Sequence, residues 1–172
     1  MIALSQIKNN NIQMKIGDKS SWVTRQLGKE EEIPYDLLLL ADETVEAINK
    51  YIFDSDIYVM EQDNNLIGIY VLCSLNKNET EIKNIAVSKA YQGQGIGRFL
   101  MQDAAIKAKE EACKSILIGT AVSAIKQISL YQIAGFEIFD VKCDFFTRNY
   151  PEPIFEDGLQ LRHMIMLRQS IK

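Results

Sequence analysis

Tyr91-Gln92-Gly93-Gln94-Gly95-Ile96-Gly97 separates two segments of different periodicity. Residues 81–87 before it have the pattern of a strand, and residues from Ile96 to about Glu111 have that of a helix. A glycine-rich turn at the start of a helix leaves backbone N–H groups without partners, beside a partial positive charge. The stretch therefore predicts a phosphate-binding loop. On glycine spacing alone, a simple tight turn before a helix remains the alternative.

Two common phosphate-binding loops do not fit this stretch. A Walker A loop needs Lys and Ser or Thr after its last glycine, whereas Gly97 is followed by Arg98. The dinucleotide motif G-x-G-x-x-G fails for the same reason, because position 98 is not glycine. What remains is Gln92-x-x-Gly95-x-Gly97, with Ile-Ala-Val upstream at 85–87. This pattern resembles the acyl-CoA-binding motif of the GNAT N-acetyltransferases.

A second motif strengthens this resemblance. Residues 130–136 read Leu-Tyr-Gln-Ile-Ala-Gly-Phe, which matches the GNAT signature L-Y-x-x-x-G-F. By itself the motif describes a helix that ends at a glycine and is followed by a packed aromatic ring. Here it follows the glycine loop by about 35 residues, and this combination is typical of the family. Residues 144–150 and the following Pro151 are similar to a group of bacterial GNAT proteins whose acceptors are poorly defined.

Periodicity and turn residues predict the order of elements around these motifs. We expect strands over residues 22–27, 57–62, 66–74, 79–87, 114–120, 136–145 and 159–167. We expect a short helix from Pro34, a second with Asp42 as N-cap to about Ile52, and two more over 96–111 and 125–134. Residues 147–158 are expected to form a loop, and residues 12–16 either a further short strand or a frayed end.

This order resembles the GNAT fold. The resemblance implies an α/β (α+β) class with a mixed, mainly antiparallel sheet of about six to seven strands flanked by helices. The strands over 79–87 and 114–120 are expected to be parallel neighbours, since a helix connects them. In the family they splay apart to form the acyl-CoA cleft, and a β-bulge is the expected device. We expect one GNAT-like domain over residues 1–172, with 1–20 as an N-terminal extension.

Composition limits the functional classes. The chain has 172 residues, 47% hydrophobic residues and a net charge of -4, which suits one globular domain and argues against a general nucleic-acid-binding protein. The apolar runs are too short to span a membrane and the first residues lack the features of a signal peptide, so we expect a cytoplasmic protein without a membrane partner. The three cysteines and one histidine lack metal-ligand spacing, so no metal site is expected.

The resemblance implies acetyl-CoA as cosubstrate and coenzyme A as its product. In the family, N–H groups of the loop hold the pyrophosphate, and the strand backbone before the loop meets the acetyl and pantetheine groups. Many members carry an Asn after the strand that ends here at Thr120; this chain has none, and Ser123 is the substitute. Arg98 either adds charge near a phosphate or faces solvent. The residues implied in CoA binding are Ile85, Ala86, Val87, Gln92, Gly93, Gln94, Gly95, Ile96, Gly97, Arg98, Ser123 and Tyr131.

Two side chains are candidates for proton transfer. Tyr131 matches the family's tyrosine near the CoA sulfur, which implies a proton donor to the leaving thiolate; a buried phenol that bonds a backbone carbonyl is the alternative. Glu81 matches the strand glutamate that acts as base in the histone acetyltransferase branch. On the same face, Lys83 could instead pair with Glu81, and Glu79 is the alternative base. Simple alternation predicts one face that carries Glu81, Lys83, Ile85 and Val87.

The resemblance implies an enzyme that transfers an acetyl group from acetyl-CoA to a primary amine of a small molecule or peptide, by direct attack in a ternary complex. The alternative is a degenerate GNAT domain that binds CoA for regulation, or packs against a partner, without catalysis. A homodimer also remains open. The acceptor pocket is expected from residues 28–45 and 145–160. There, Glu30, Glu31, Glu32 and Asp36 indicate either a cationic acceptor or a solvated loop.

Overall fold

The computed structural model describes residues 23–172, so the predictions for residues 1–20, for the short strand over 12–16 and for Trp22 lie outside the described residues. The strands are β1 (Val23–Gln26), β2 (Asp56–Gln62), β3 (Asn65–Asn76), β4 (Glu79–Val87), β5 (Ser115–Ala121), β6 (Glu137–Lys142), β7 (Phe155–Glu156), β8 (Leu159–Gln160) and β9 (Met164–Ser170). The helices are α1 (Tyr35–Leu38), α2 (Val45–Asn49), α3 (Ile96–Glu110), α4 (Ile125–Ile133) and α5 (Phe145–Asn149), with short 3-10 turns η2 (Ile52–Asp54) and η3 (Lys89–Tyr91).

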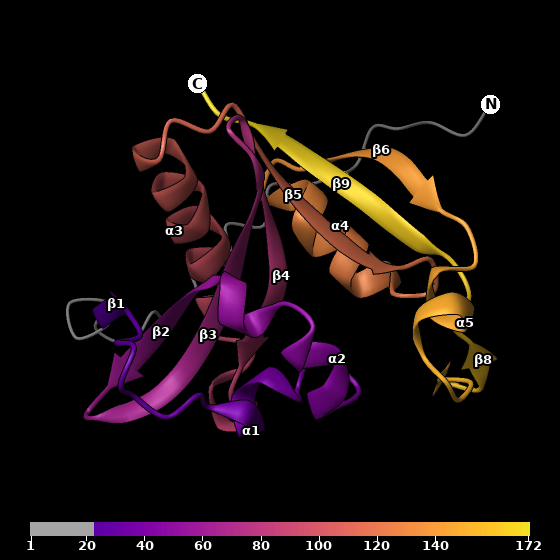
Figure 1. Ribbon diagram of the computed structural model, residues 1–172, viewed down its shortest axis with the longest axis horizontal. Helices are drawn as coiled ribbons and strands as arrows, with labels where there is room; N and C mark the ends of the chain where they lie inside the picture. The colour runs from indigo at the N-terminus through magenta and orange to yellow at the C-terminus, as the bar shows by residue number, and fades with distance from the viewer. Residues whose placement is uncertain (1–22) are drawn as a thin grey trace, which may run out of the picture.

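A seven-stranded sheet organises the described chain, in the order β1-β2-β3-β4-β5-β9-β6 (Figure 1). β4 and β5 are its parallel pair, and every other pair of neighbours is antiparallel. β7 and β8 form a separate two-stranded sheet. The expected mixed, mainly antiparallel sheet is therefore confirmed. Among residues 23–172, no helix combines the length and the apolar composition that crossing a bilayer requires.

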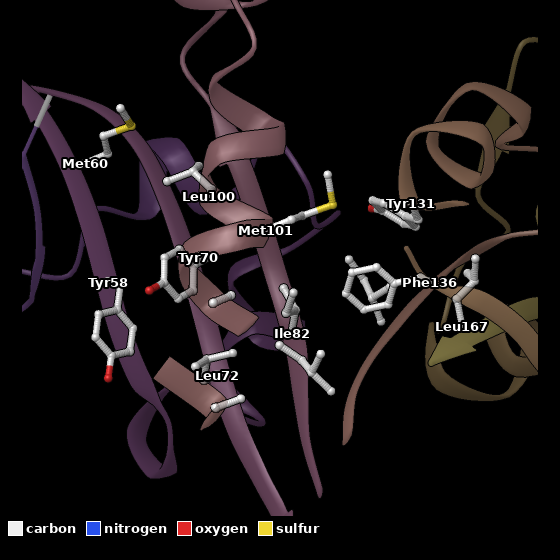
Figure 2. Packing of buried hydrophobic residues seen from close by; sticks show 14 of the residues in the cluster. Tyr58, Met60, Tyr70, Leu72, Ile82, Leu100, Met101, Tyr131, Phe136 and Leu167 are labelled. Carbon is white, nitrogen blue, oxygen red and sulfur yellow. The ribbon is translucent and has the colours of Figure 1, made fainter. Parts of the chain in front are cut away.

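Helices cover both faces of β2, β3 and β4. Side chains of α3 pack on one face with Tyr70 and Ile82. On the opposite face, Leu38 of α1 and Ile48 of α2 form a second core cluster. Tyr131 of α4 belongs to the α3 cluster, as the view from close by shows (Figure 2). Alternate residues of the central strands thus serve two separate cores, as strand geometry requires.

β4 and β5 stay paired over only part of their length. The parallel ladder ends at the pair Ile82–Ile118. In the antiparallel ladder to β3, consecutive residues of β3 pair with Ile82 and Asn84, which leaves Lys83 as an extra residue. β4 therefore carries a β-bulge at the point where it leaves β5. The predicted splay of these two strands, with a bulge as the device, is confirmed.

The bulge corrects the predicted faces of β4. Ile85 and Val87 pack against the core cluster beneath α3. By contrast, the Nζ atom of Lys83 lies 6.0 Å from the ring centre of Tyr51, which packs in the α1–α2 cluster. Glu81 pairs with Lys83 on that second face. The prediction of one common face is wrong because the extra residue reverses the alternation after position 83.

Several predicted boundaries were also wrong. Thr44, and not Asp42, is the N-cap of α2, because its Oγ1 accepts a hydrogen bond of 3.1 Å from the backbone N–H of Ala47. The strand expected over 136–145 ends at Lys142, and the left-handed conformation of Asp144 (φ 55°) precedes the unpredicted helix α5. Residues 159–160 belong to the β7–β8 hairpin, so the last strand of the large sheet begins later than expected, at 164.

Candidate active site

The glycine loop precedes α3 in a conformation that suits an anion. Gly93 and Gly95 have φ of 76° and 89°, in the left-handed region that glycine adopts without strain. Gly95 is the N-cap of α3, and the first turn of this 15-residue helix holds no acidic residue. Within the described residues, no hydrogen bond engages the backbone N–H groups of residues 93–98. These donors and the helix dipole are therefore available to an external anion.

Gly97 has no packing reason to be glycine. Its φ lies outside the left-handed region, and a Cβ built there would approach only the Val87 Cγ2 atom, at 4.0 Å. Alanine would favour the helix by about 1 kcal/mol over glycine. Arg98, the next residue, is exposed and makes no ion pair within the described part of the chain. Packing within the protein therefore does not explain a glycine at this position. The remaining explanation is that an external group approaches the backbone closely here.

The side chain of Gln92 holds the loop in place. Its Nε2 donates a hydrogen bond of 3.0 Å to the backbone carbonyl of Val87, the last residue of β4. This bond ties the start of the loop to the end of the strand. The amide is therefore engaged inside the protein, while the backbone N–H groups of residues 93–98 make no hydrogen bond to the part of the chain that the structure describes.

A cavity of about 680 Å³ opens where β4 leaves β5. Its walls come from the loop before α2, the bulge of β4, β5, α4 and the segment from α5 to β7. In Figure 1 the ribbon places α5 and β8 across from α2 on the same side of the sheet. Polar lining residues include Asp42, Tyr51, Glu81, Lys83, Asn84 and Tyr131. A volume of this size is within the range for small-molecule sites.

Tyr131 lines this cavity, and its hydroxyl is unengaged within the described residues. The side chain is 8% exposed. In Figure 2 the hydroxyl end of the ring points toward Met101 of α3. Burial raises the pKa of Tyr131 to about 12, so the hydroxyl stays protonated at neutral pH. The alternative role of a phenol that bonds a backbone carbonyl therefore has no support in the hydrogen-bond pattern.

The two glutamates of β4 have different surroundings. Glu81 is 5% exposed, lines the cavity and lies 3.2 Å from the Nζ atom of Lys83. Glu79 lies at the closed end of the β4–β5 pair, where it accepts hydrogen bonds from Asn76 and Ser115. These two bonds lower the pKa of Glu79. Glu81 is therefore the carboxylate of β4 that lines the cavity. It also forms the ion pair with Lys83 that was the alternative expected from the sequence.

Sequence reasoning missed a hydrogen-bond network at the far side of the cavity. The hydroxyls of Tyr150 and Tyr51 donate to Oδ1 and Oδ2 of Asp42, at 3.0 and 3.2 Å. Asn84 Nδ2 donates to the Tyr51 hydroxyl at 3.2 Å and to the carbonyl of Leu38 at 3.0 Å. Burial is the main cause that raises the pKa of both tyrosines. A polar Asn directly before the apolar run over residues 85–87 was the signal that could have indicated this network.

The structure places the remaining residues predicted to bind CoA in different parts of the protein. Ile85 lines the cavity, whereas the side chain of Ala86 is buried in the α1–α2 cluster. The loop over 92–98 and Ser123 are not part of the cavity lining. Within the described residues, no group of three or more His, Cys, Asp or Glu side chains is arranged to hold a metal ion.

The acidic residues before and within α1 lie outside the cavity, although other residues of the ranges 28–45 and 145–160 line it. The lining includes neither residues 30–32 nor Asp36, and Glu31 pairs instead with Arg25 at 2.7 Å. The acidic side chains that do line the cavity are Asp42, Glu43, Glu81 and Glu156. Of the two alternatives given for residues 30–32 and Asp36, the structure agrees with a solvated acidic loop, since these side chains are exposed.

Comparison with known protein families supports this description. Residues 23–136 match the model of the Acetyltransferase (GNAT) family. Over 144 residues the chain is 43% identical to the uncharacterized N-acetyltransferase YvbK of Bacillus subtilis, a match that covers 83% of this chain and 92% of that protein.

Solved structures agree with the family match. A GNAT family acetyltransferase from Elizabethkingia anophelis, with acetyl-CoA bound, has a TM-score of 0.85 at 43% identity, over 88% of this chain and 99% of that chain. A Bacillus subtilis acetyltransferase in complex with CoA has a TM-score of 0.81 at 38% identity, over 88% and 99%. The predicted fold class is confirmed by these structures. The chain therefore belongs to the GNAT acetyltransferase family.

Proposed function

We propose that this protein is an N-acetyltransferase that moves an acetyl group from acetyl-CoA to a primary amine of a small molecule or peptide, by direct attack in a ternary complex. Membership of the acetyltransferase family supports acetyl transfer. Two similar proteins have been solved with acetyl-CoA or CoA bound, which supports the same cosubstrate here. The acceptor is an open question that the lining of the cavity helps to narrow.

The start of α3 fits the pyrophosphate of CoA. Its free backbone N–H groups over residues 93–98 supply donors, and Gly97 leaves room for an oxygen to approach the backbone. The unpaired edge of β4 beyond Ile82 offers backbone groups to the thioester end of the molecule. In this proposal a backbone N–H on that edge stabilises the charge that develops on the thioester oxygen.

Glu81 and Tyr131 supply the proton transfers in this proposal. Glu81 takes a proton from the acceptor ammonium, directly or through water. The neutral nitrogen then attacks the thioester carbonyl carbon, so that a C–N bond forms and the C–S bond breaks, and the electron pair leaves on sulfur. The second proton that the nitrogen loses as the amide forms passes to solvent or to the departing sulfur. Tyr131 donates a hydrogen bond to that sulfur as its charge grows. The pKa of Tyr131, about 12, exceeds that of a thiol, near ~8.5. Tyr131 therefore keeps its proton while its hydrogen bond stabilises the thiolate.

One observation carries the proposal: the cavity that opens at the β4–β5 separation is lined by both Glu81 and Tyr131. The test is incubation with acetyl-CoA and a panel of primary amines. We expect amine-dependent release of the CoA thiol, with an equal amount of acetylated amine detected by mass spectrometry. Binding of CoA without transfer to any amine would contradict catalysis and favour a regulatory CoA-binding domain.

A further inference from the structure

The far side of the cavity presents hydrogen-bond acceptors. We use the name Asp42 wall for Asp42, Tyr51, Asn84 and Tyr150. Both tyrosine hydroxyls donate to the carboxylate of Asp42, and the amide nitrogen of Asn84 donates to Tyr51 and to Leu38. Each side-chain donor of the wall is therefore already used inside the protein. A ligand that binds here must supply donors of its own.

Asn84 provides an acceptor that the protein leaves without a partner. Its side chain is 3% exposed, and its Oδ1 atom has no hydrogen-bond partner among the described residues. A flip of the amide would turn Oδ1 toward the carbonyl of Leu38, so the observed orientation is the favourable one. A buried carbonyl oxygen without a donor costs roughly 1–3 kcal/mol. Because this oxygen is also shielded from solvent, the half-buried carboxylate of Asp42 is the better-placed acceptor of the wall for a ligand in the cavity.

The net charge of the side chains that line the cavity also favours a ligand that donates hydrogen bonds. Within the described residues, no Lys or Arg pairs with Asp42, Glu43 or Glu156, whereas Lys83 is paired with Glu81. Lys50 is the remaining cation of the lining, and it donates to the backbone carbonyl of residue 149. Three unpaired carboxylates thus face one lysine without a carboxylate partner. The cavity favours a cation over an anion.

We propose that the acetyl acceptor carries a second cationic, donor-rich group besides the amine that is acetylated, and that this group binds at the Asp42 wall. The inference rests on the proposed function, since it assigns the reacting amine to the Glu81 side of the same cavity. An ammonium would donate to the carboxylate of Asp42. A ligand carboxylate at this position would meet only acceptors and negative charge. The acceptor class is therefore a diamine or a related dication, and not an amino acid with a free carboxylate at that end.

The test is calorimetric titration of the protein in the presence of CoA. The probes are α,ω-diamines of increasing length, with the monoamine and the ω-amino acid of equal length. We expect at least one diamine to bind about tenfold more tightly than its monoamine, with the ω-amino acid weakest. Asp42→Asn keeps the shape and the acceptor for Tyr150 but removes the charge, so it should reduce the diamine advantage to below about threefold.

Glu46→Gln is the matched control, because Glu46 is an exposed carboxylate on α2 outside the cavity lining. It should leave the diamine preference unchanged. Equal affinities for diamine and monoamine at every length, no diamine binding, or an unchanged preference in Asp42→Asn would overturn the inference. Acetyl transfer is measured in parallel. Transfer without a diamine preference refutes this inference alone, whereas a diamine preference without transfer refutes the proposed catalysis alone.

Discussion

The hydroxyl of Tyr150 donates a hydrogen bond of 3.0 Å to Oδ1 of Asp42, across 108 positions of the chain. The bond joins the residue that follows α5 to the loop that precedes α2. Asp42 also receives the hydroxyl of Tyr51 on its other oxygen. One carboxylate thus connects two walls of the cavity that come from distant parts of the sequence.

Tyr150→Phe should loosen this connection. Loss of one hydrogen bond predicts a decrease of about 1 kcal/mol in the free energy of unfolding, measured by urea denaturation. It should also raise KM for the amine by about threefold or more, with kcat little changed, since the bond shapes the pocket without touching the reacting atoms. Tyr35→Phe is the control, because Tyr35 donates to Asn49 Oδ1 at 2.7 Å outside the cavity lining. If both variants change KM equally, the Asp42 bond has no special role in the pocket.

Gly97→Ala tests the phosphate loop with the smallest possible change. The added methyl group has no close neighbour and the position is helical, so the fold should be kept or slightly stabilised. CoA affinity, measured by calorimetry, should fall by about tenfold or more, because the methyl group occupies space that the pyrophosphate needs. Gln102→Ala, an exposed change on the same helix, should leave that affinity unchanged. Wild-type affinity in a folded Gly97→Ala protein would place the pyrophosphate elsewhere.

Tyr131→Phe separates a catalytic from a structural hydroxyl. The ring stays in the core and the hydroxyl has no partner in the described chain, so the melting temperature should hold. The turnover rate should fall by roughly 10²-fold with CoA affinity little changed. Since the pKa is about 12, the wild-type pH–rate profile should show no decline caused by Tyr131 below roughly pH 10. A rate within about twofold of wild type would remove Tyr131 from the mechanism.

Glu81→Gln and Glu79→Gln form a matched pair on one strand. Gln at position 81 still accepts from Lys83 but cannot remove a proton, so kcat should fall by roughly 10²-fold. Gln at position 79 lies outside the cavity lining and should leave kcat unchanged. Equal losses in the two variants would argue against Glu81 as the base. The readout is initial rate with a saturating amine.

Glu79→Gln should instead affect stability in a pH-dependent way. The hydrogen bonds from Asn76 and Ser115 lower the pKa of Glu79 in the folded protein. Its stabilising contribution is therefore fully present above the unfolded pKa, near ~4.3, and is lost as pH falls through the lower folded value. Urea denaturation of both proteins should show a wild-type advantage at neutral pH that shrinks in acid. A difference that does not change between these conditions would contradict the assignment.

Local patterns predicted the elements that depend on local chemistry. The bounds of β4, and those of α3 to within a residue, follow from the glycine loop between them, and Gly135 (φ 99°) ends α4 as its position predicts. Asp42 was misassigned because its carboxylate bonds two tyrosines that only the tertiary structure brings to it. The position of the bulge at Lys83 could likewise not be predicted from the sequence, because a bulge depends on how two neighbouring strands pair and not on the sequence of one strand.

The extra residue at position 83 also has a consequence for deletions. A one-residue deletion there would restore a continuous two-residue phase along β4. Downstream of the deletion, Ile85 and Val87 would stay on the face of the core beneath α3 and Asn84 on the opposite face, because Ile82 and Asn84 already pair with consecutive residues of β3. Loss of Lys83 would thus leave the two faces of the strand unchanged but would remove the bulge at the point where β4 leaves β5. A one-residue deletion at position 83 should for this reason keep the core packing and narrow the opening between β4 and β5.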